Sequence, residues 1–284
     1  MAAFPRLSPR ARAALAGALG LAVIACLPQW AGGAQDGAGA FAAARQRGTL
    51  VVGVPYLAPP PVAGAKVRTP EGLDLPAAER LAKELGVAVQ LRQVGAGEAA
   101  AALAAGQADV VLADGGQGTP SAAGVAVVPS GYATRPKAVI RSDTAMRRGA
   151  DARGRTACVA EAARAAGELA ESWGAQVRRY RVPSDALVAV REGACDLGLV
   201  DDAVWEPLMR FPEWKKFSAT LAAEGARRER QWLLPEGDEA SRQWLQARMR
   251  QWGRDGAWKE MAAKWARDVA FDVYLDQEVP DCHG

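Results

Sequence analysis

Few side chains in this chain of 284 residues could serve as a catalytic base or nucleophile. The only histidine is His283, next to the last residue, so a Ser-His-Asp or Cys-His site in the body of the protein is not expected. A zinc site that needs several imidazoles is excluded for the same reason, and Cys282 beside His283 does not change this. We therefore expect no metal and no cofactor, and a chemistry of binding through charged and aromatic side chains.

Two arginines are candidates for binding an anion. Arg164 lies at the predicted start of a helix, where backbone N–H groups already favour negative charge. Arg135 is a second donor that can bind a carboxylate with two nitrogens. The alternative for each is an arginine solvated at the surface.

The N-terminus is typical of an export signal. Three arginines within residues 6–12 precede an apolar run over residues 13–27. That run of roughly 15 residues is shorter than the ~20 that a membrane-spanning helix needs. We expect residues 1–34 to be a signal peptide, removed by ordinary cleavage or, alternatively, processed at a lipobox so that Cys26 is acylated. In both cases the mature protein is expected in the periplasm.

The mature chain carries no net charge. The formal charge is +3, from 35 basic and 32 acidic residues, and three of the basic residues belong to the signal segment. A neutral protein gives no electrostatic reason to expect nucleic acid or an anionic membrane as partner.

Three cysteines remain after the signal segment, namely Cys158, Cys195 and Cys282. An exported protein can form disulfides. Three thiols cannot all pair within one chain, so one is left over, and spacing alone does not identify it.

The body alternates short apolar strands with amphipathic helices. Ala78, Leu81, Ala82 and Leu85 lie on one helical face, and Gly86 ends that helix. This alternation predicts an α/β protein, and similar blocks over 49–113 and 156–200 predict two lobes. In such folds the ligand lies at the carboxyl ends of the strands. Strands are expected at residues 49–55, 87–91, 109–113, 156–160, 176–180 and 196–200. Helices are expected at residues 76–85 and 184–192 and around 258–265, with one further helix that ends near residue 106 and one that begins after residue 163.

Five motifs, in order, resemble the bacterial extracellular solute-binding proteins of family 3, the amino-acid-binding components of ABC importers. They lie at residues 72–86, 103–111, 153–155, 193–201 and 255–265, so the resemblance covers about 45 to 266. Residues 267–284 have no counterpart in it.

The resemblance implies the type II periplasmic binding protein fold, in which doubly wound, mainly parallel sheets form two lobes joined by a two-strand hinge. Lobe one is then expected at 46–137 plus 230–284, and lobe two at 138–229. The chain should cross between them near 134–138 and 230–234, and ligand should close the cleft by hinge motion.

The expected ligand clamp is only half present. The resemblance implies that Asp201 binds the ammonium of an amino acid, although Asp201 could instead cap the following helix. The arginine expected for the carboxylate falls at Ala122, and the small hydroxyl residues expected in lobe two are Ala162 and Ala163.

Other candidate ligand residues follow from their positions in the resemblance. Tyr56 and Tyr132 stand where the family stacks a ring on the ligand, although each could instead pack at the edge of its lobe. Arg135 lies beside the first crossing. Thr119 and Thr134 are weaker candidates, since turn formation explains them equally well. Asp74 matches a family motif and is interpreted mainly as structural.

The leading hypothesis is therefore a non-catalytic periplasmic receptor, expected as a monomer, that binds an amino acid or related organic ion for an inner-membrane ABC permease. The alternative keeps the fold without transport, as an accessory or sensory protein such as a partner of a periplasmic quinoprotein dehydrogenase. A third, enzymatic hypothesis follows periplasmic dehydratases of the same fold and would use Asp201 or Glu161 as acid or base.

Overall fold

The computed structural model describes residues 39–60, 69, 72–95, 97–115, 124–215, 219–221 and 227–274. The predicted signal peptide with Cys26 lies outside the described residues, as do Thr119, Ala122 and Cys282.

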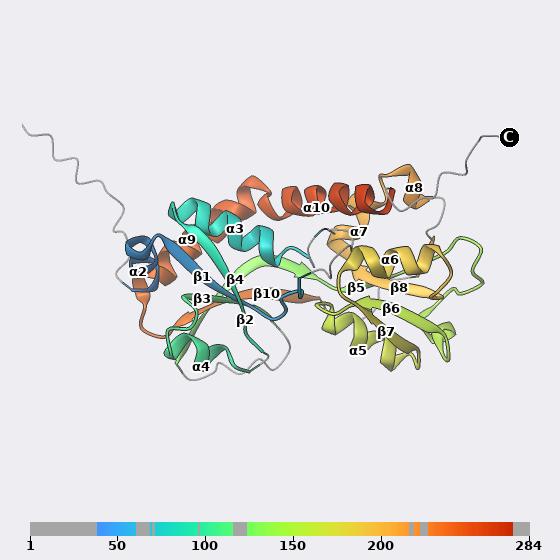
Figure 1. Cartoon of the computed structure of the whole chain (residues 1–284), viewed down its shortest axis with the longest axis horizontal. Coiled ribbons are helices and arrows are strands. Elements are labelled where there is room, and N and C mark those ends of the chain that lie inside the picture. Colours follow the sequence, from blue (N-terminus) through green and yellow to red (C-terminus); the bar gives the residue numbers. More distant parts are fainter. Residues whose placement is uncertain are drawn as a thin grey trace, which may run out of the picture. The chain divides into compact units, whose positions relative to one another are not determined.

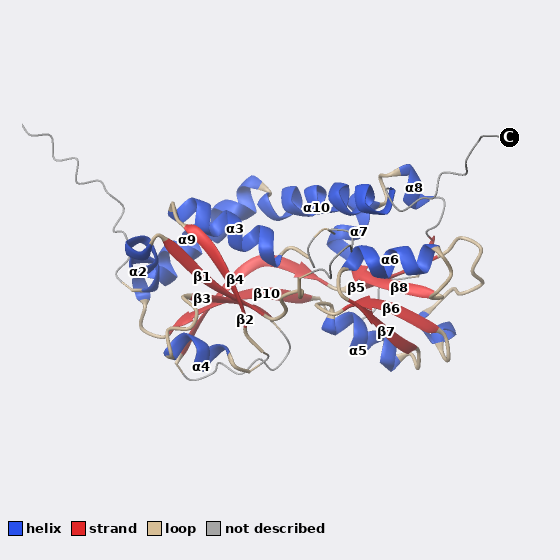
Figure 2. Ribbon diagram, viewed as in Figure 1, coloured by secondary structure: helices blue, strands red, loops and turns tan. Residues whose placement is uncertain are grey.

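The first sheet has five strands in the order β2-β1-β3-β10-β4. The three strands β2, β1 and β3 run parallel, and β10 is antiparallel to both β3 and β4 (Figure 2). The bounds are β1 (Thr49–Val54), β2 (Ala88–Gln93), β3 (Val110–Asp114), β4 (Val125–Thr134) and β10 (Arg228–Pro235).

The second sheet repeats this arrangement in the order β7-β6-β8-β5-β9. Its strands β7, β6 and β8 are parallel, and β5 is antiparallel to β8 and β9. The predicted pair of similar α/β blocks is thus confirmed as two sheets, each with three parallel strands. The bounds are β5 (Pro136–Ile140), β6 (Thr156–Ala160), β7 (Gln176–Tyr180), β8 (Leu197–Asp201) and β9 (Ala219–Thr220).

Helices pack on both sheets (Figure 1). The helix predicted at 76–85 buries the apolar face that its periodicity predicts. Ala78, Leu81, Ala82 and Leu85 are all buried, and Gly86 ends their helix at φ 77°. The bounds are α2 (Ala40–Arg47), α3 (Asp74–Leu85), α4 (Ala99–Ala104), α5 (Arg164–Ser172), α6 (Pro183–Arg191), α7 (Asp202–Leu208), α8 (Pro212–Lys215), α9 (Glu239–Asp255) and α10 (Ala257–Tyr274).

Helix α10 belongs to one apolar core that draws on both sheets. Its stripe of Trp258, Met261, Ala262 and Trp265 is buried as expected, and the helix packs against α9 and against α6, α7 and α8 (Figure 1). The same core contains Leu187 of α6. Among the described residues, none of the helices is both long and apolar enough to cross a membrane.

The chain passes between the sheets twice. The first passage is at Arg135, between β4 and β5, within the expected segment 134–138. The return precedes Arg228, earlier than the expected 230–234, because the whole of β10 belongs to the first sheet. Gly115 donates to the carbonyl of Glu229 at 2.7 Å, and a Cβ on Gly115 would lie 2.2 Å from that oxygen. The lobe boundaries stated above remain a prediction.

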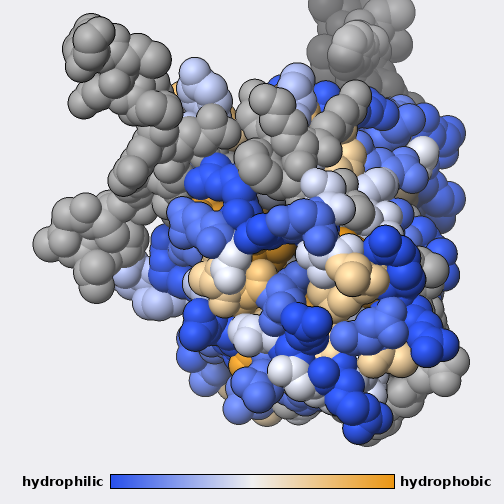
Figure 3. All heavy atoms as spheres, turned by 90° about the vertical axis from the view of Figure 1, so that its right-hand side faces the viewer, coloured by the Kyte–Doolittle hydropathy of each residue, from blue (hydrophilic) through white to orange (hydrophobic). Residues whose placement is uncertain are grey.

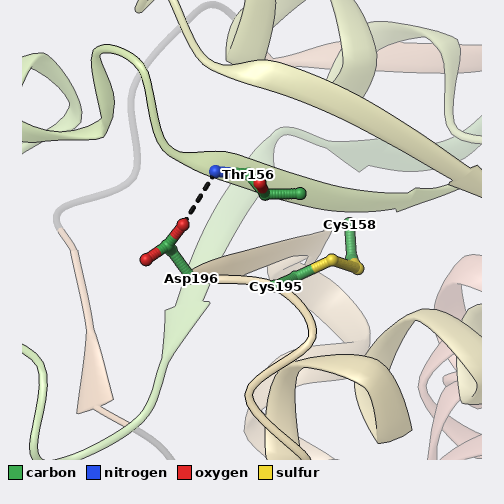
Figure 4. The surroundings of a disulfide bond; sticks show 4 residues. All are labelled: Thr156, Cys158, Cys195 and Asp196. Atoms are coloured by element: carbon green, nitrogen blue, oxygen red, sulfur yellow. Dashed lines mark hydrogen bonds between the residues drawn. A yellow bond between two sulfur atoms is a disulfide. The ribbon is translucent and has the colours of Figure 1, made fainter.

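A disulfide joins Cys158 of β6 to Cys195, at a Cα–Cα distance of 5.9 Å (Figure 4). Next to Cys195, the carboxylate of Asp196 accepts a hydrogen bond from the backbone of Thr156 at 2.8 Å. Of the three cysteines that spacing could not pair, Cys282 is therefore the one left over.

Figure 3 shows the end of the molecule at which the second sheet lies. The described residues on this surface are mainly hydrophilic.

Removing the disulfide should destabilise the protein. Because the bond closes a segment of 37 residues, a Cys158→Ala/Cys195→Ala variant is expected to lose about 3–4 kcal/mol of unfolding free energy. Urea titration followed by circular dichroism measures this. Cys282→Ser is the matched control, and an equal loss in that variant would contradict the pairing.

Candidate functional site

A pocket lies where the carboxyl ends of strands from both sheets meet. It is lined by the ends of β3, β4, β6 and β8 and by the starts of α3 and α5, and it contains about 930 Å³ of space, part of it open to solvent. This is the place predicted for ligand in an α/β fold. Its charged lining residues are Asp74, Asp114, Arg135, Arg164, Asp201, Arg228 and Arg230.

Asp201 ends strand β8 and lines the pocket. Asp201 occupies the N-cap position of helix α7, but its side chain makes no capping hydrogen bond there. The side chain of Thr134, at the end of β4, lies beside this carboxylate and favours its ionised form. Burial raises the pKa of Asp201 to about 6; the nearby charges of Asp114 and Asp202 add to the rise, and Arg230 and Thr134 oppose it.

Tyr132 is buried beside Asp201. Its ring stacks on Trp258 with centroids 4.7 Å apart, which fixes the ring from the α10 side. Tyr132 lines the pocket, and its buried hydroxyl has no hydrogen-bond partner among the described residues. Burial, and next the negative charge of Asp201, raise the pKa of Tyr132 well above its ordinary value.

Arg230 of β10 also reaches the pocket, although the sequence analysis did not single it out as a ligand residue. Its Nη1 lies 2.5 Å from Asp114 Oδ1, and its Nη2 donates to both carboxylate oxygens of Asp74. Burial alone would lower the pKa of Arg230, but the carboxylates of Asp74, Asp114 and Asp201 raise it above its ordinary value. Asp74, interpreted as structural, therefore belongs to the pocket lining too.

The two predicted anion-binding arginines line this pocket. Arg164 is the first residue of α5 and is exposed. Ala162 and Ala163, beside it, present no hydroxyl to the pocket. Arg135 Nε lies 3.5 Å from Asp202, which also pairs with Arg227.

The remaining candidates lie elsewhere. Tyr56 is not in the main pocket but lines an adjoining groove with Glu161 and Arg164, and its hydroxyl donates to the carbonyl of Arg181 at 3.4 Å. Thr119 lies outside the described residues. Asp114 and Arg230 also line the pocket but were not predicted as ligand residues. Each could have been found from its position, because Asp114 directly follows a predicted strand and Arg230 lies at an expected crossing between the lobes.

The pocket can hold a molecule of mixed charge. Asp201 offers an anion at one point of the lining, and Arg164 offers a cation together with the N-terminus of α5. Within the described residues no group of three or more His, Cys, Asp or Glu side chains is arranged to hold a metal ion.

The profile of the bacterial extracellular solute-binding proteins, family 3, matches residues 50–268 of the chain. A search with the chain's own sequence matches no curated protein.

Solved structures share the fold at low sequence identity. An amino acid ABC transporter substrate-binding protein from Streptococcus pneumoniae, bound to L-arginine, has a TM-score of 0.58 at 16% identity and covers 81% of this chain and 98% of its own. A mutant of ArgBP from T. maritima has a TM-score of 0.56 at 19% identity, covering 80% and 98%. The ancestral amino acid-binding protein AncCDT-1, a precursor of cyclohexadienyl dehydratase, has 0.55 at 20% identity, covering 80% and 99%.

Replacing Asp201 should stabilise the unliganded protein. Its pKa of about 6 lies above the ordinary value near 4, so between these values the folded state binds more protons and stability falls as pH rises. At pH 7, Asp201→Asn is expected to gain roughly 1–3 kcal/mol of unfolding free energy, the lower part of that range if cleft water screens the charge. The gain should vanish near pH 4.

Urea titrations at pH 4 and pH 7 measure this difference. Asp202→Asn is the matched control, because the neighbouring carboxylate pairs with Arg227 at 2.6 Å and its loss should give no gain. Equal behaviour of the two variants would contradict the assignment.

Proposed function

The chain belongs to the bacterial extracellular solute-binding proteins of family 3, and we propose that it is the non-catalytic solute receptor of an ABC importer. It binds a small polar solute, an amino acid or related organic ion, in the pocket between the two sheets. The bound solute is delivered to an inner-membrane permease. Export by the segment 1–34, with or without acylation of Cys26, belongs to the same proposal.

One observation carries the proposal: a carboxylate and a guanidinium, each without an ion-pair partner, line the same pocket. Among the described residues, neither Asp201 nor Arg164 forms an ion pair with another side chain, whereas Arg135, Arg228 and Arg230 do. An ammonium at Asp201 and a carboxylate at Arg164 would satisfy both charges. The N-terminus of α5 supports the carboxylate, so Arg164 takes the part of the arginine missing at Ala122.

The alternative is an accessory or sensory protein of the same fold, such as a partner of a periplasmic quinoprotein dehydrogenase. Ala162 and Ala163 favour it, because no hydroxyl side chain stands beside Arg164 to fix a carboxylate. Co-purification from the native membrane separates the two, since a receptor brings down a permease and an accessory protein brings down a dehydrogenase.

Solute binding should depend on both charges. Isothermal titration against a panel of amino acids and organic acids is expected to give a saturable heat with at least one of them. Asp201→Asn and Arg164→Ala should each weaken that binding roughly tenfold to hundredfold, the worth of a hydrogen bond to a charged group. Arg178→Ala, at an exposed arginine of β7 outside the pocket, should bind as the unmodified protein does.

Binding should also weaken in acid. An ammonium needs Asp201 ionised, and the pKa of Asp201 in the unliganded protein is about 6. Affinity is therefore expected to fall about tenfold per pH unit below 6, and to be level above it. No heat with any solute, or an affinity that rises in acid, would contradict the receptor proposal.

A further inference from the structure

The guanidinium of Arg230 lies in the pocket lining, where the carboxylates of Asp74 and Asp114 hold it from two sides. Its side chain is 17% exposed, and that of Asp74 is 12% exposed. The three partners come from separate elements, since Arg230 lies on β10, Asp114 ends β3 and Asp74 begins α3. A guanidinium gripped by two carboxylates is fixed in position, because its planar nitrogens match carboxylate oxygens two at a time.

This guanidinium is poorly suited to bind the carboxylate of a solute. Both of its terminal nitrogens already donate, one to Asp114 and the other to Asp74. The group of three carries a net charge of −1 when all are ionised, so a further carboxylate nearby is repelled. Arg230 therefore does not replace the arginine missing at Ala122, and its acidic partners form a subsite that suits a cation.

A second observation places free binding capacity in the same part of the pocket. The hydroxyl of Tyr132 is unpartnered although the residue is only 7% exposed. Tyr132 lies on β4, which pairs with the strand that carries Arg230, and both residues line the pocket. An unpartnered buried hydroxyl is costly, and a polar ligand group beside the Arg230 cluster would satisfy it.

We propose that Arg230 is a built-in guanidinium that fills a cation subsite of the pocket, formed by Asp74 and Asp114, and so restricts the solute to molecules without a cationic side chain. This inference rests on the proposed receptor function and adds a solute class to it. The small solute then lies between Asp201, Tyr132 and Arg164. The protein should bind neither arginine nor lysine, because their side-chain cations would compete for carboxylates that Arg230 already occupies.

Removing the Arg230 side chain should let the subsite bind a cation from solution. Arg230→Ala leaves Asp74 and Asp114 facing a space of guanidinium size. Methylguanidinium chloride at millimolar concentration, far below denaturing levels, is expected to raise the melting temperature of this variant, by roughly 3–5 °C for each tenfold rise in its concentration above the dissociation constant. The unmodified protein should show no such rise, and sodium chloride at equal ionic strength should not reproduce it.

Arg228→Ala is the matched control. Arg228 lies two residues away on the same strand, lines the same pocket and pairs with Glu168 at 3.0 Å, but its side chain is 43% exposed. Its removal changes the net charge equally and should create no methylguanidinium site. Stabilisation of Arg230→Ala alone, growing with the logarithm of the methylguanidinium concentration, supports the proposal. A folded Arg230→Ala that methylguanidinium does not stabilise, or an equal response of Arg228→Ala, overturns it.

Should Arg230→Ala not fold by itself, refolding is carried out with and without methylguanidinium. Recovery of the native circular dichroism spectrum with methylguanidinium, and not with sodium chloride, supports the proposal, and failure to recover overturns it. Adding Asp74→Asn and Asp114→Asn to the variant should abolish the gained response. The measured quantity is the stabilisation that methylguanidinium gives to the Arg230→Ala variant. This stabilisation can be absent while the unmodified protein still binds a solute. It can also be present if the unmodified protein proves not to be a receptor.

Discussion

The ion pairs of Arg230 with Asp74 and Asp114 are the constraint around which the pocket is arranged. A buried charge is costly unless it is paired and hydrogen-bonded. By meeting this need, Arg230 fastens strand β10, on which the chain returns to the first sheet, to the end of β3 and the start of α3. The pairing occupies the acidic part of the pocket. Among the described residues that line the pocket, Asp201 is then the carboxylate without a salt bridge.

Under the proposed function, the pocket separates charges that pair with one another from charges that a bound solute would pair with. Those of the Arg230 cluster satisfy one another, whereas Asp201 is held at a cost that its raised pKa records. Arg164 remains exposed at the start of α5. A residue that lowers the stability of the empty protein and is satisfied only by a bound molecule is what a binding site requires.

Helix α10 links this site to the rest of the molecule. Trp258 supports the ring of Tyr132, and Trp265 lines the pocket itself. The same helix packs against α6, α7 and α8 beyond the second sheet, and it extends past residue 268, where the match to the family ends. Movement of the two sheets against each other must therefore involve the packing of this helix.

Periodicity and short motifs within single segments predicted the six strands β1, β2, β3, β6, β7 and β8, the amphipathic helices, the two α/β blocks and the family. They did not predict the antiparallel strands β4, β5, β9 and β10. Asp201, Tyr132, Thr134, Arg135 and Arg164, which were singled out from the sequence, all line one pocket. Their roles toward a solute belong to the proposed function. The pairing of Cys158 with Cys195 and the contacts of Arg230 with Asp74 and Asp114 depend on the folded structure. The cysteines lie 37 residues apart, and Arg230 lies 156 and 116 residues from its two partners. These residues meet through sheet order and strand register, which no local pattern in the chain encodes.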